Sequence, residues 1–261
     1  MKTISIIGNK GGQGRTNVCA NLAASLVLKG KKVLCVDLDA QSNLSSCLSI
    51  NVPEELPLTI VDFIERYIKQ EEIGDVREAI QHLHGIDLIA STVRLNDFEF
   101  QLQSIMDGVY AISTILDGLN EYDYILIDCN SNTEGIYNIA ALAASDECIL
   151  PTQAQFLSSN NIQITLSIIQ KVKRKINRSL KIGGIVLTMA QQHTNSAKNA
   201  IERVHTDYSD YANIFDTIIP FSVAVSDSNE HGVPTVLYSP SNKVSIAYKS
   251  FAEEVINYGN R

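Results

Sequence analysis

The sequence predicts a three-layer α/β sandwich built on a mostly parallel, twisted central sheet. Short runs rich in Val, Ile and Leu alternate along the chain with longer segments that carry apolar residues at helical spacing. Several of the short runs, such as 32–37 and 124–128, are almost continuously apolar, as strands covered on both faces require. Because parallel strands are joined by crossover helices, we expect helices on both faces of one sheet.

Strands are predicted where these short apolar runs end at a turn residue or an acid. The run 3–8 ends at a glycine, and the runs 32–37 and 124–128 each end at an aspartate. In chain order, the expected strands are 3–8, 32–37, 86–90, 124–128, 147–151, 181–188 and 214–220. The loops that follow them are expected to carry ligands, since the carboxyl ends of parallel strands share one edge of the sheet.

Helices are predicted where apolar residues recur three or four positions apart between the strands. They are expected at 16–29, 59–70, 95–119, 134–143, 160–177, 195–208 and 243–258. Segments 51–57 and 222–241 contain several turn residues, so both are expected to be loop-rich. No linker rich in Pro, Gly or Ser divides the 261 residues, and we therefore expect a single domain over 1–261.

Composition and charge exclude several classes of protein. The net charge of −8 and the pI near 5.1 argue against a protein that coats nucleic acid with its whole surface, so any such contact must be local. No stretch approaches the roughly 20 apolar residues that span a bilayer, and no signal-peptide pattern is visible, so a cytosolic protein is expected. Five cysteines without a CxxC pair are expected to be reduced and buried: Cys19, Cys35, Cys47, Cys129 and Cys148.

A glycine-rich segment connects the first predicted strand to the first predicted helix. Backbone N–H groups in such a turn, together with the positive helix end, suit phosphate oxygens. Gly8 and Gly14 have the spacing of the GxxxxGK[ST] phosphate loop, but Arg15 stands in place of the lysine. Because a guanidinium lacks the compact charge of an ammonium, we expect nucleotide binding to survive and hydrolysis to be slow or altered. The alternative is that this segment is a glycine-rich turn between a strand and a helix that binds no nucleotide.

Acidic residues end two of the other predicted strands. Asp37 and Asp39 are two positions apart at a strand end, so both can face the phosphate loop. Asp128 ends the run 124–128, an arrangement in which a carboxylate holds Mg²⁺ through water. For Asp37 and Asp39, the alternative is a pair of solvated aspartates in a turn.

Together, these motifs resemble the ParA/MinD family of P-loop ATPases. The string KGGQGRT at 10–16 carries the extra lysine of that family, and the segment 37–43 is similar to its DxDPQxN motif with Ala in place of Pro. Asp128 matches the Walker B acid of the family, although the two prolines that usually follow soon after are absent. Met189 and Pro220 lie in segments that resemble those with which the family contacts the nucleotide base.

The resemblance implies a P-loop NTPase fold with ATP or ADP and Mg²⁺ as cofactors. It implies that Lys10 acts across a nucleotide-bound dimer and that Asp39 orients the attacking water. It assigns Thr16, Asp37 and Asp128 to Mg²⁺. The nucleotide-binding residues that it implies are Lys10, Gly11, Gly12, Gln13, Gly14, Arg15, Thr16, Asn17, Met189 and Pro220.

The resemblance also implies partners. Members of the family form a homodimer on ATP, respond to an adaptor of ParB-like role, and act on nonspecific DNA or on a membrane. The membrane members end in a basic amphipathic helix, which segment 257–261 does not resemble, so nonspecific DNA and a cytoplasmic, nucleoid-associated location are expected. A solvated helix end is the alternative explanation of the densest basic cluster. This cluster consists of Lys171, Lys173, Arg174, Lys175, Arg178 and Lys181.

The leading hypothesis is a ParA-like, ATP-dependent dimerising switch with weak ATP hydrolysis. It would bind nonspecific DNA and position or partition a DNA or other large cellular cargo through an adaptor protein. The alternative is a nucleotide-bound scaffold or regulator that does not hydrolyse ATP, because of Arg15. A metabolic or iron-sulfur enzyme of the same fold would need a substrate pocket or cluster ligands, and the sequence offers no clear set of either.

Overall fold

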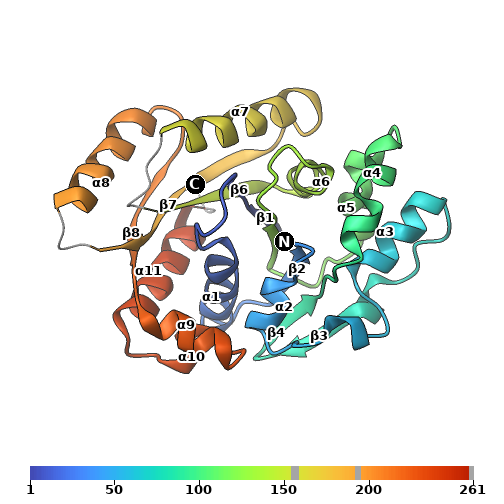
Figure 1. The fold of residues 1–261 in the computed structure, drawn as a ribbon, viewed down its shortest axis with the longest axis horizontal. Coiled ribbons are helices and arrows are strands. Elements are labelled where there is room, and N and C mark those ends of the chain that lie inside the picture. The colour runs from blue at the N-terminus through green and yellow to red at the C-terminus, as the bar shows by residue number, and fades with distance from the viewer. Residues whose placement is uncertain (154–158, 192–194, 259–261) are drawn as a thin grey trace.

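The computed structural model describes residues 1–153, 159–191 and 195–258 and is built around one sheet (Figure 1). Within these residues the sheet has eight strands in the order β3-β4-β2-β5-β1-β6-β7-β8. Their bounds are β1 Lys2–Ile6, β2 Val33–Leu38, β3 Ile80–Leu83, β4 Ile86–Ile89, β5 Tyr124–Cys129, β6 Glu147–Gln153, β7 Lys181–Ala190 and β8 Ile214–Pro220. All neighbouring pairs are parallel except β3 with β4, which confirms the mostly parallel sheet.

Helices cover both faces of this sheet, as Figure 1 shows. One face carries α1 Arg15–Leu28, α2 Asn43–Cys47, α9 Val223–Glu230, α10 Thr235–Tyr238 and α11 Lys243–Tyr258. The other carries α3 Ile60–Lys69, α4 Leu95–Ser104, α5 Ala111–Ile115, α6 Ile136–Ala144, α7 Ser159–Lys175 and α8 Asn195–Tyr208. Single turns of 3₁₀ helix occur at Pro53–Glu55, Val76–Ala79 and Gly108–Tyr110. The predicted three-layer sandwich is therefore confirmed.

Each face of the sheet has its own apolar core. Along β2, Leu34 and Val36 pack into one core, whereas Val33 and Cys35 pack into the other. This alternation follows from the two-residue period of a strand, and burial on both sides explains the continuous apolar runs in the sequence. All five cysteines are free and buried, as expected. No described helix has the length and apolarity needed to span a lipid bilayer.

The predicted helix 95–119 is wrong as a single element. It is divided into α4, the turn Gly108–Tyr110 and α5. The chain folds back closely at this division, since a Cβ atom at Gly108 would lie only 2.1 Å from the carbonyl oxygen of Leu102. Glycine permits the close approach that ends the helix early.

Two other segments also differ from the prediction. No strand was predicted between 70 and 86, but His82 lies in β3 and His84 begins a tight turn with a φ of 55°. In β3, His82 Nδ1 lies 2.5 Å from Asp87 Oδ1 of the antiparallel neighbour β4. Segment 222–241, which was expected to be loop-rich, contains α9 and α10.

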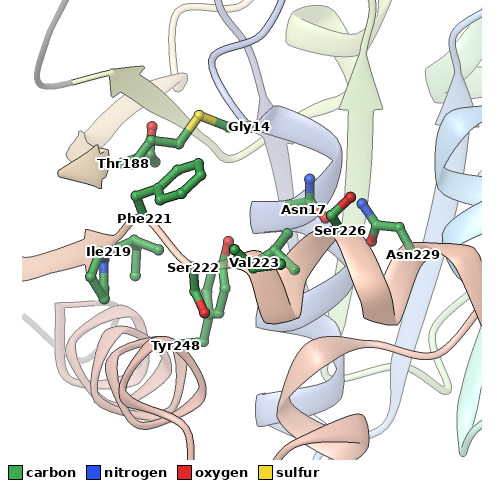
Figure 2. A pocket seen from close by; sticks show the side chains of 13 residues that line it. Gly14, Asn17, Thr188, Ile219, Phe221, Ser222, Val223, Ser226, Asn229 and Tyr248 are labelled. Atoms are coloured by element: carbon green, nitrogen blue, oxygen red, sulfur yellow. The ribbon is translucent and has the colours of Figure 1, made fainter. Parts of the chain in front are cut away.

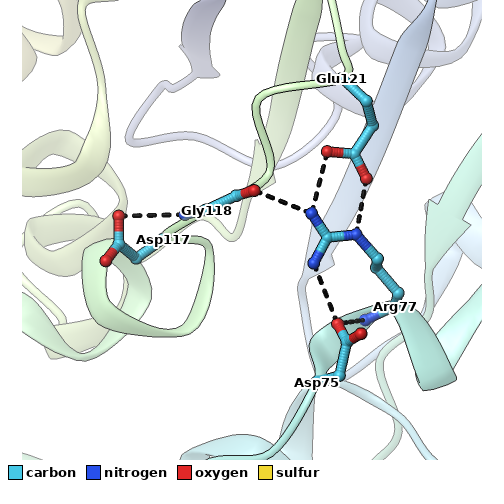
Figure 3. A network of polar contacts seen from close by, with 5 residues as sticks. All are labelled: Asp75, Arg77, Asp117, Gly118 and Glu121. Carbon is cyan, nitrogen blue, oxygen red and sulfur yellow. Dashed lines mark hydrogen bonds and ion pairs between the residues drawn. The ribbon is translucent and has the colours of Figure 1, made fainter.

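An arginine network fastens the segment before β3 to the loop before β5 (Figure 3). Arg77 donates from Nε and Nη2 to the two carboxylate oxygens of Glu121, at 2.7 and 3.0 Å. It also donates to the carbonyl oxygen of Gly118 at 2.8 Å and to Asp75 at 3.1 Å. These groups are solvent-exposed, so we assign the network to loop geometry rather than to a large share of the stability.

Thr59 caps the N-terminus of α3 and provides a test of local stability. Its backbone N–H and its hydroxyl donate to Asp62 Oδ2 at 2.8 and 2.9 Å. We expect Thr59→Ala to lower the free energy of unfolding by about 1 kcal/mol in urea denaturation, because the cap is lost. Thr59→Ser keeps the hydroxyl and serves as the control. Equal stability of the Ala variant and the native protein would contradict this assignment.

Candidate functional site

The carboxyl ends of three central strands meet beside the start of α1. In the register of the sheet, Asp37 of β2 pairs with Asp128 of β5, and Asp128 in turn pairs with Ile6 of β1. The loops that follow these strands therefore share one edge of the sheet. This is the edge at which ligands bind in open α/β sheets.

The loop between β1 and α1 is shaped by glycines. Gly12 and Gly14 have φ angles of 76° and 79°, a left-handed conformation that glycine adopts without strain. No side chain caps the first turn of α1, so its N–H groups remain available for an anion. The Thr188 hydroxyl of β7 donates to the Gln13 carbonyl oxygen at 2.9 Å and anchors the loop from the other side.

Arg15 is buried beneath this loop. Its Nη1 donates to the carbonyl oxygens of Gly8 and Lys10, both at 2.7 Å, and its Nε donates to that of Cys129 at 3.0 Å. One guanidinium thus joins the loop to the end of β5. A lysine has a single nitrogen, so it could not reproduce the planar fork that reaches all three carbonyl groups.

Thr16 and Asp128 form the polar centre of the site. The Thr16 hydroxyl donates to Asp128 Oδ2 at 2.7 Å, whereas Asp128 Oδ1 is buried without a hydrogen-bond partner. Burial, with a contribution from the charge of Asp37, raises the pKa of Asp128 to about 8. A hydroxyl beside a buried, unsatisfied carboxylate oxygen fits a hard divalent cation such as Mg²⁺, which prefers oxygen ligands.

Asp37 is fully buried, and its carboxylate is already hydrogen-bonded by the protein. Its Oδ2 accepts from the backbone N–H and the hydroxyl of Ser45, at 2.9 and 2.8 Å, and its Oδ1 accepts from the Asp39 N–H at 3.1 Å. Burial raises its pKa to about 6 against the opposing effect of these bonds. Through its bonds to Ser45, Asp37 positions α2. A contact between Asp37 and Mg²⁺ stays a prediction.

A cavity of about 430 Å³ lies above the loop and forms the first half of the site. Its lining residues include the loop residues from Gly11 to Asn17, together with Asp39. Lys10 is exposed at the loop tip and is not part of this lining. Its exposed position is compatible with the predicted role across a dimer, which the single chain does not test.

A second cavity, of about 480 Å³, adjoins the first (Figure 2). The two share Gly14, Asn17, Met189 and Asn229 in their linings. The rest of the second lining is largely apolar and includes Ile219, Pro220, Phe221, Val223, Val225 and Tyr248. Both residues that the family resemblance assigns to the base, Met189 and Pro220, therefore line this cavity. Met189 holds a left-handed φ of 52°, which is unusual for a residue other than glycine.

Several lining residues were not identified from the sequence. Asn43, Ser46 and Cys47 reach the first cavity from α2, which was not predicted. Asn229 reaches both cavities from α9, in the segment expected to be loop-rich. Neither α2 nor α9 has a strong apolar stripe that would predict a helix. The signal that could have pointed to these residues was the similarity of the neighbouring sequence motifs to those of the family.

The predicted basic cluster lies on a different surface, at the C-terminal end of α7 and the start of β7. All six of its side chains are exposed, and none takes part in the ion pairs found among the described residues. A groove of about 750 Å³ between α7 and α8 is lined in part by Lys171, Arg174 and Tyr211. The cluster is thus a local positive surface on an acidic protein.

The fold and the site define a class of protein. A parallel sheet, a glycine-rich loop from its central β1 into α1, a helix-start threonine and a buried acid at the end of β5 are the features of a P-loop nucleoside triphosphatase. The second cavity provides an apolar wall beside that loop, of a size suited to a nucleotide base.

Comparison with known proteins agrees with this class. The model of an AAA domain family matches residues 1–182. The sporulation initiation inhibitor protein Soj of Bacillus subtilis is 31% identical over 259 residues, covering 99% of each chain. The chromosome-partitioning ATPase Soj of Treponema pallidum is 31% identical over 256 residues, covering 98% of this chain and 97% of that protein.

A solved structure extends the comparison to the fold. Cobyrinic acid a,c-diamide synthase of Mycobacterium smegmatis, with bound ADP and magnesium, superimposes with a TM-score of 0.85, covering 100% of this chain and 96% of that one. At 23% identity, this likeness concerns the fold alone. Taken with the relatives, the chain belongs to the ParA/MinD family of P-loop ATPases, close to its ParA-like partitioning members.

Proposed function

We propose that this protein binds ATP or ADP with Mg²⁺ across the two adjoining cavities. The observation that carries the proposal is their complementary chemistry. The first cavity presents the uncapped start of α1 and the glycine loop to phosphates, and the second presents apolar side chains to a base. Thr16 and Asp128 would hold Mg²⁺, which would neutralise phosphate charge.

The nucleotide would control dimerisation, and the dimer would act as the switch. Lys10 at the exposed loop tip would reach the phosphates of a second copy, and Asp39 at the cavity wall would orient the attacking water. Because linkage is reciprocal, a partner that binds only the dimer also changes nucleotide affinity. We propose that an adaptor of ParB-like role uses this coupling to position or partition a DNA or other large cargo.

A second candidate function follows from Arg15. Its three hydrogen bonds to backbone carbonyl groups keep the guanidinium beneath the loop, where a family member would extend an ammonium toward the phosphates. Under this candidate, the protein is a nucleotide-bound scaffold that dimerises but hydrolyses little ATP. The two candidates share the binding site and differ only in turnover.

Sedimentation and phosphate release separate these candidates. The purified protein would be examined with no nucleotide, with ADP and with ATP, each with Mg²⁺ and with or without nonspecific DNA. A dimer found only with ATP, together with slow phosphate release, is the result expected for the switch. An ATP dimer without phosphate release would select the scaffold, and the absence of any response to nucleotide would refute both.

We propose that the basic cluster binds the phosphate backbone of nonspecific DNA. Its exposed side chains carry no ion-pair partner among the described residues, so little has to be broken when DNA binds. We expect the double change of Lys173 and Lys175 to Ala to weaken DNA binding and to reduce the salt slope of the affinity by about 2. Electrophoretic mobility shifts at several salt concentrations would measure both effects.

The control for this test is Lys243→Ala, which removes an exposed charge at the start of α11. It should leave the affinity for DNA and the salt slope close to those of the native protein. If Lys243→Ala weakens binding half as much as the double change, each removed charge has the same effect, so the interaction follows total charge and the cluster has no special part in it.

A further inference from the structure

One buried asparagine holds the loop that follows β5. Asn138 lies in the first turn of α6 and is fully buried. Its Nδ2 donates to the carbonyl oxygens of Asn130 and Asn132, at 3.0 and 2.9 Å, and to Asn130 Oδ1 at 3.1 Å. Asn130 Oδ1 also accepts from the Asn132 N–H at 2.9 Å, which identifies this atom as the oxygen. Because every neighbour of the Asn138 nitrogen is an acceptor, the loop itself fixes the orientation of the amide.

Packing alone does not explain an asparagine at this place. Asn138 Oδ1 is buried without a hydrogen-bond partner, which lowers the stability of the fold. An apolar side chain of similar size, such as leucine, would avoid this penalty and would leave the loop unheld. Asn138 thus destabilises the protein through its oxygen and fastens the loop through its nitrogen.

The loop is fastened on both sides of Ser131. Before it, the Cys129 carbonyl oxygen accepts from Arg15 Nε at 3.0 Å. After it, the Asn132 carbonyl oxygen accepts from Asn138 and also from the Gly135 N–H at 2.8 Å. A Cβ atom at Gly135 would lie 3.0 Å from that oxygen, so glycine permits the close turn. Segment 129–135 is therefore a fastened turn in which Ser131 is exposed.

Ser131 connects this turn to the first cavity. It lines that cavity, whereas the other residues of the turn do not, and its hydroxyl has no hydrogen-bond partner within the described part of the chain. Ser131 does not line the second cavity, which we propose for the base. With the base there, the phosphates extend away from it, so the outermost phosphate lies in the part of the first cavity that the second does not share. Ser131 lines that part.

We infer that Asn138 is a positioning residue that controls the preference for ATP over ADP. It holds the turn so that the Ser131 hydroxyl donates to the outermost phosphate of ATP, a group that ADP lacks. The inference rests on the proposed function and assigns a part in it to two residues that the sequence motifs do not include.

Calorimetric titration with ADP and with a non-hydrolysable ATP analogue tests this assignment. Each would be titrated with Mg²⁺ present, at one protein concentration. We expect Ser131→Ala to bind the analogue about tenfold more weakly than the native protein does and to bind ADP equally well, the effect of one hydrogen bond to a charged group. Asn138→Ala should show the same selective loss. The double variant should bind the analogue no more weakly than either single variant, because both changes remove the same contact.

Hydrogen exchange in the absence of nucleotide tests the turn directly. The N–H groups of Asn132 and Gly135 are hydrogen-bonded within the turn, so they should exchange slowly in the native protein and faster in Asn138→Ala. Ser131→Ala is the matched control, since it leaves these bonds in place and should exchange at the native rate. Asn138→Leu refills the buried space without a donor. It should therefore fold at least as stably as Asn138→Ala and still lose the preference for the analogue.

The outcomes separate this inference from the proposed function. If both single variants bind the analogue as tightly as the native protein does, the inference is refuted while nucleotide binding stands. If Asn138→Ala and Asn138→Leu weaken the analogue and ADP equally, or if the two effects add in the double variant, Asn138 does not act through Ser131 and the inference is refuted. If the native protein binds neither nucleotide, the proposed function itself fails.

Discussion

Replacing Arg15 with Ala is expected to lower the free energy of unfolding by about 3 kcal/mol, because it leaves buried carbonyl groups without a donor. The carbonyl oxygens concerned are those of Gly8, Lys10 and Cys129. We also expect the variant to lose measurable binding of ATP, since the loop is no longer held in the shape that receives phosphates. Chemical denaturation and calorimetric titration would measure the two effects.

Arg15→Lys is the matched variant, since it keeps the charge and restores the residue type of the GxxxxGK[ST] pattern. Its single nitrogen can still reach the Gly8 and Lys10 carbonyl groups, but the fixed bond from Nε to Cys129 is lost. We therefore expect intermediate stability, retained nucleotide binding and faster hydrolysis than in the native protein. Hydrolysis unchanged or slower in Arg15→Lys would show that the guanidinium does not limit turnover.

Replacing Asp128 with Asn is expected to stabilise the protein at alkaline pH in the absence of Mg²⁺ and nucleotide. Burial raises the pKa of Asp128 from 3.8 to about 8, so the folded protein retains a proton that the unfolded chain releases. Stability due to this group is complete below about pH 4 and falls as the pH rises toward 8. At pH 8 to 9 the variant should unfold with a free energy several kcal/mol higher than that of the native protein.

The same substitution should have the opposite effect once ligand is added. The asparagine side chain lacks the negative charge that would attract a divalent cation. Mg²⁺ with ATP should therefore raise the melting temperature of the native protein and not that of Asp128→Asn. Thermal unfolding at several pH values, with and without Mg²⁺ and ATP, measures both effects. Asp210→Asn, at an exposed position, is the control and should follow the native curve throughout. A native protein without pH dependence between 4 and 8 would contradict the assignment.

The parts of the site that sequence could predict are those that are local in the chain. The spacing of Gly8 and Gly14 and the position of Asp128 at a strand end can be read without knowledge of distant segments, and the structure places them together. The strands of the central sheet could be predicted for a similar reason, since burial on both faces leaves a continuous apolar run. Among the strands of the described residues, only β3, at the edge of the sheet, was missed, because none of its four residues is buried.

The rest of the site depends on helices that carry little sequence signal. α9 has eight residues, of which only Ser228 is buried, so the apolar stripe that predicts a helix is absent. Asn229 therefore could not be assigned to the junction of the two cavities. The family resemblance assigned Asp37 to Mg²⁺, whereas its hydrogen bonds to Ser45 depend on α2, a short helix that the sequence did not predict.

During translation, the parts of the site are synthesised at different times, so the site cannot form until its last part is made. The loop that starts α1 is held from the far side by the Thr188 hydroxyl, 175 positions later in the chain, and α1 receives a hydrogen bond from the backbone of Val236 through Asn21. Contacts this distant form late and slow the folding of a chain. At about 5–20 residues per second, the loop leaves the ribosome many seconds before its supports. A nascent chain thus carries the glycine-rich loop well before the supports of that loop exist, and we expect nucleotide to bind only after the C-terminal half has folded.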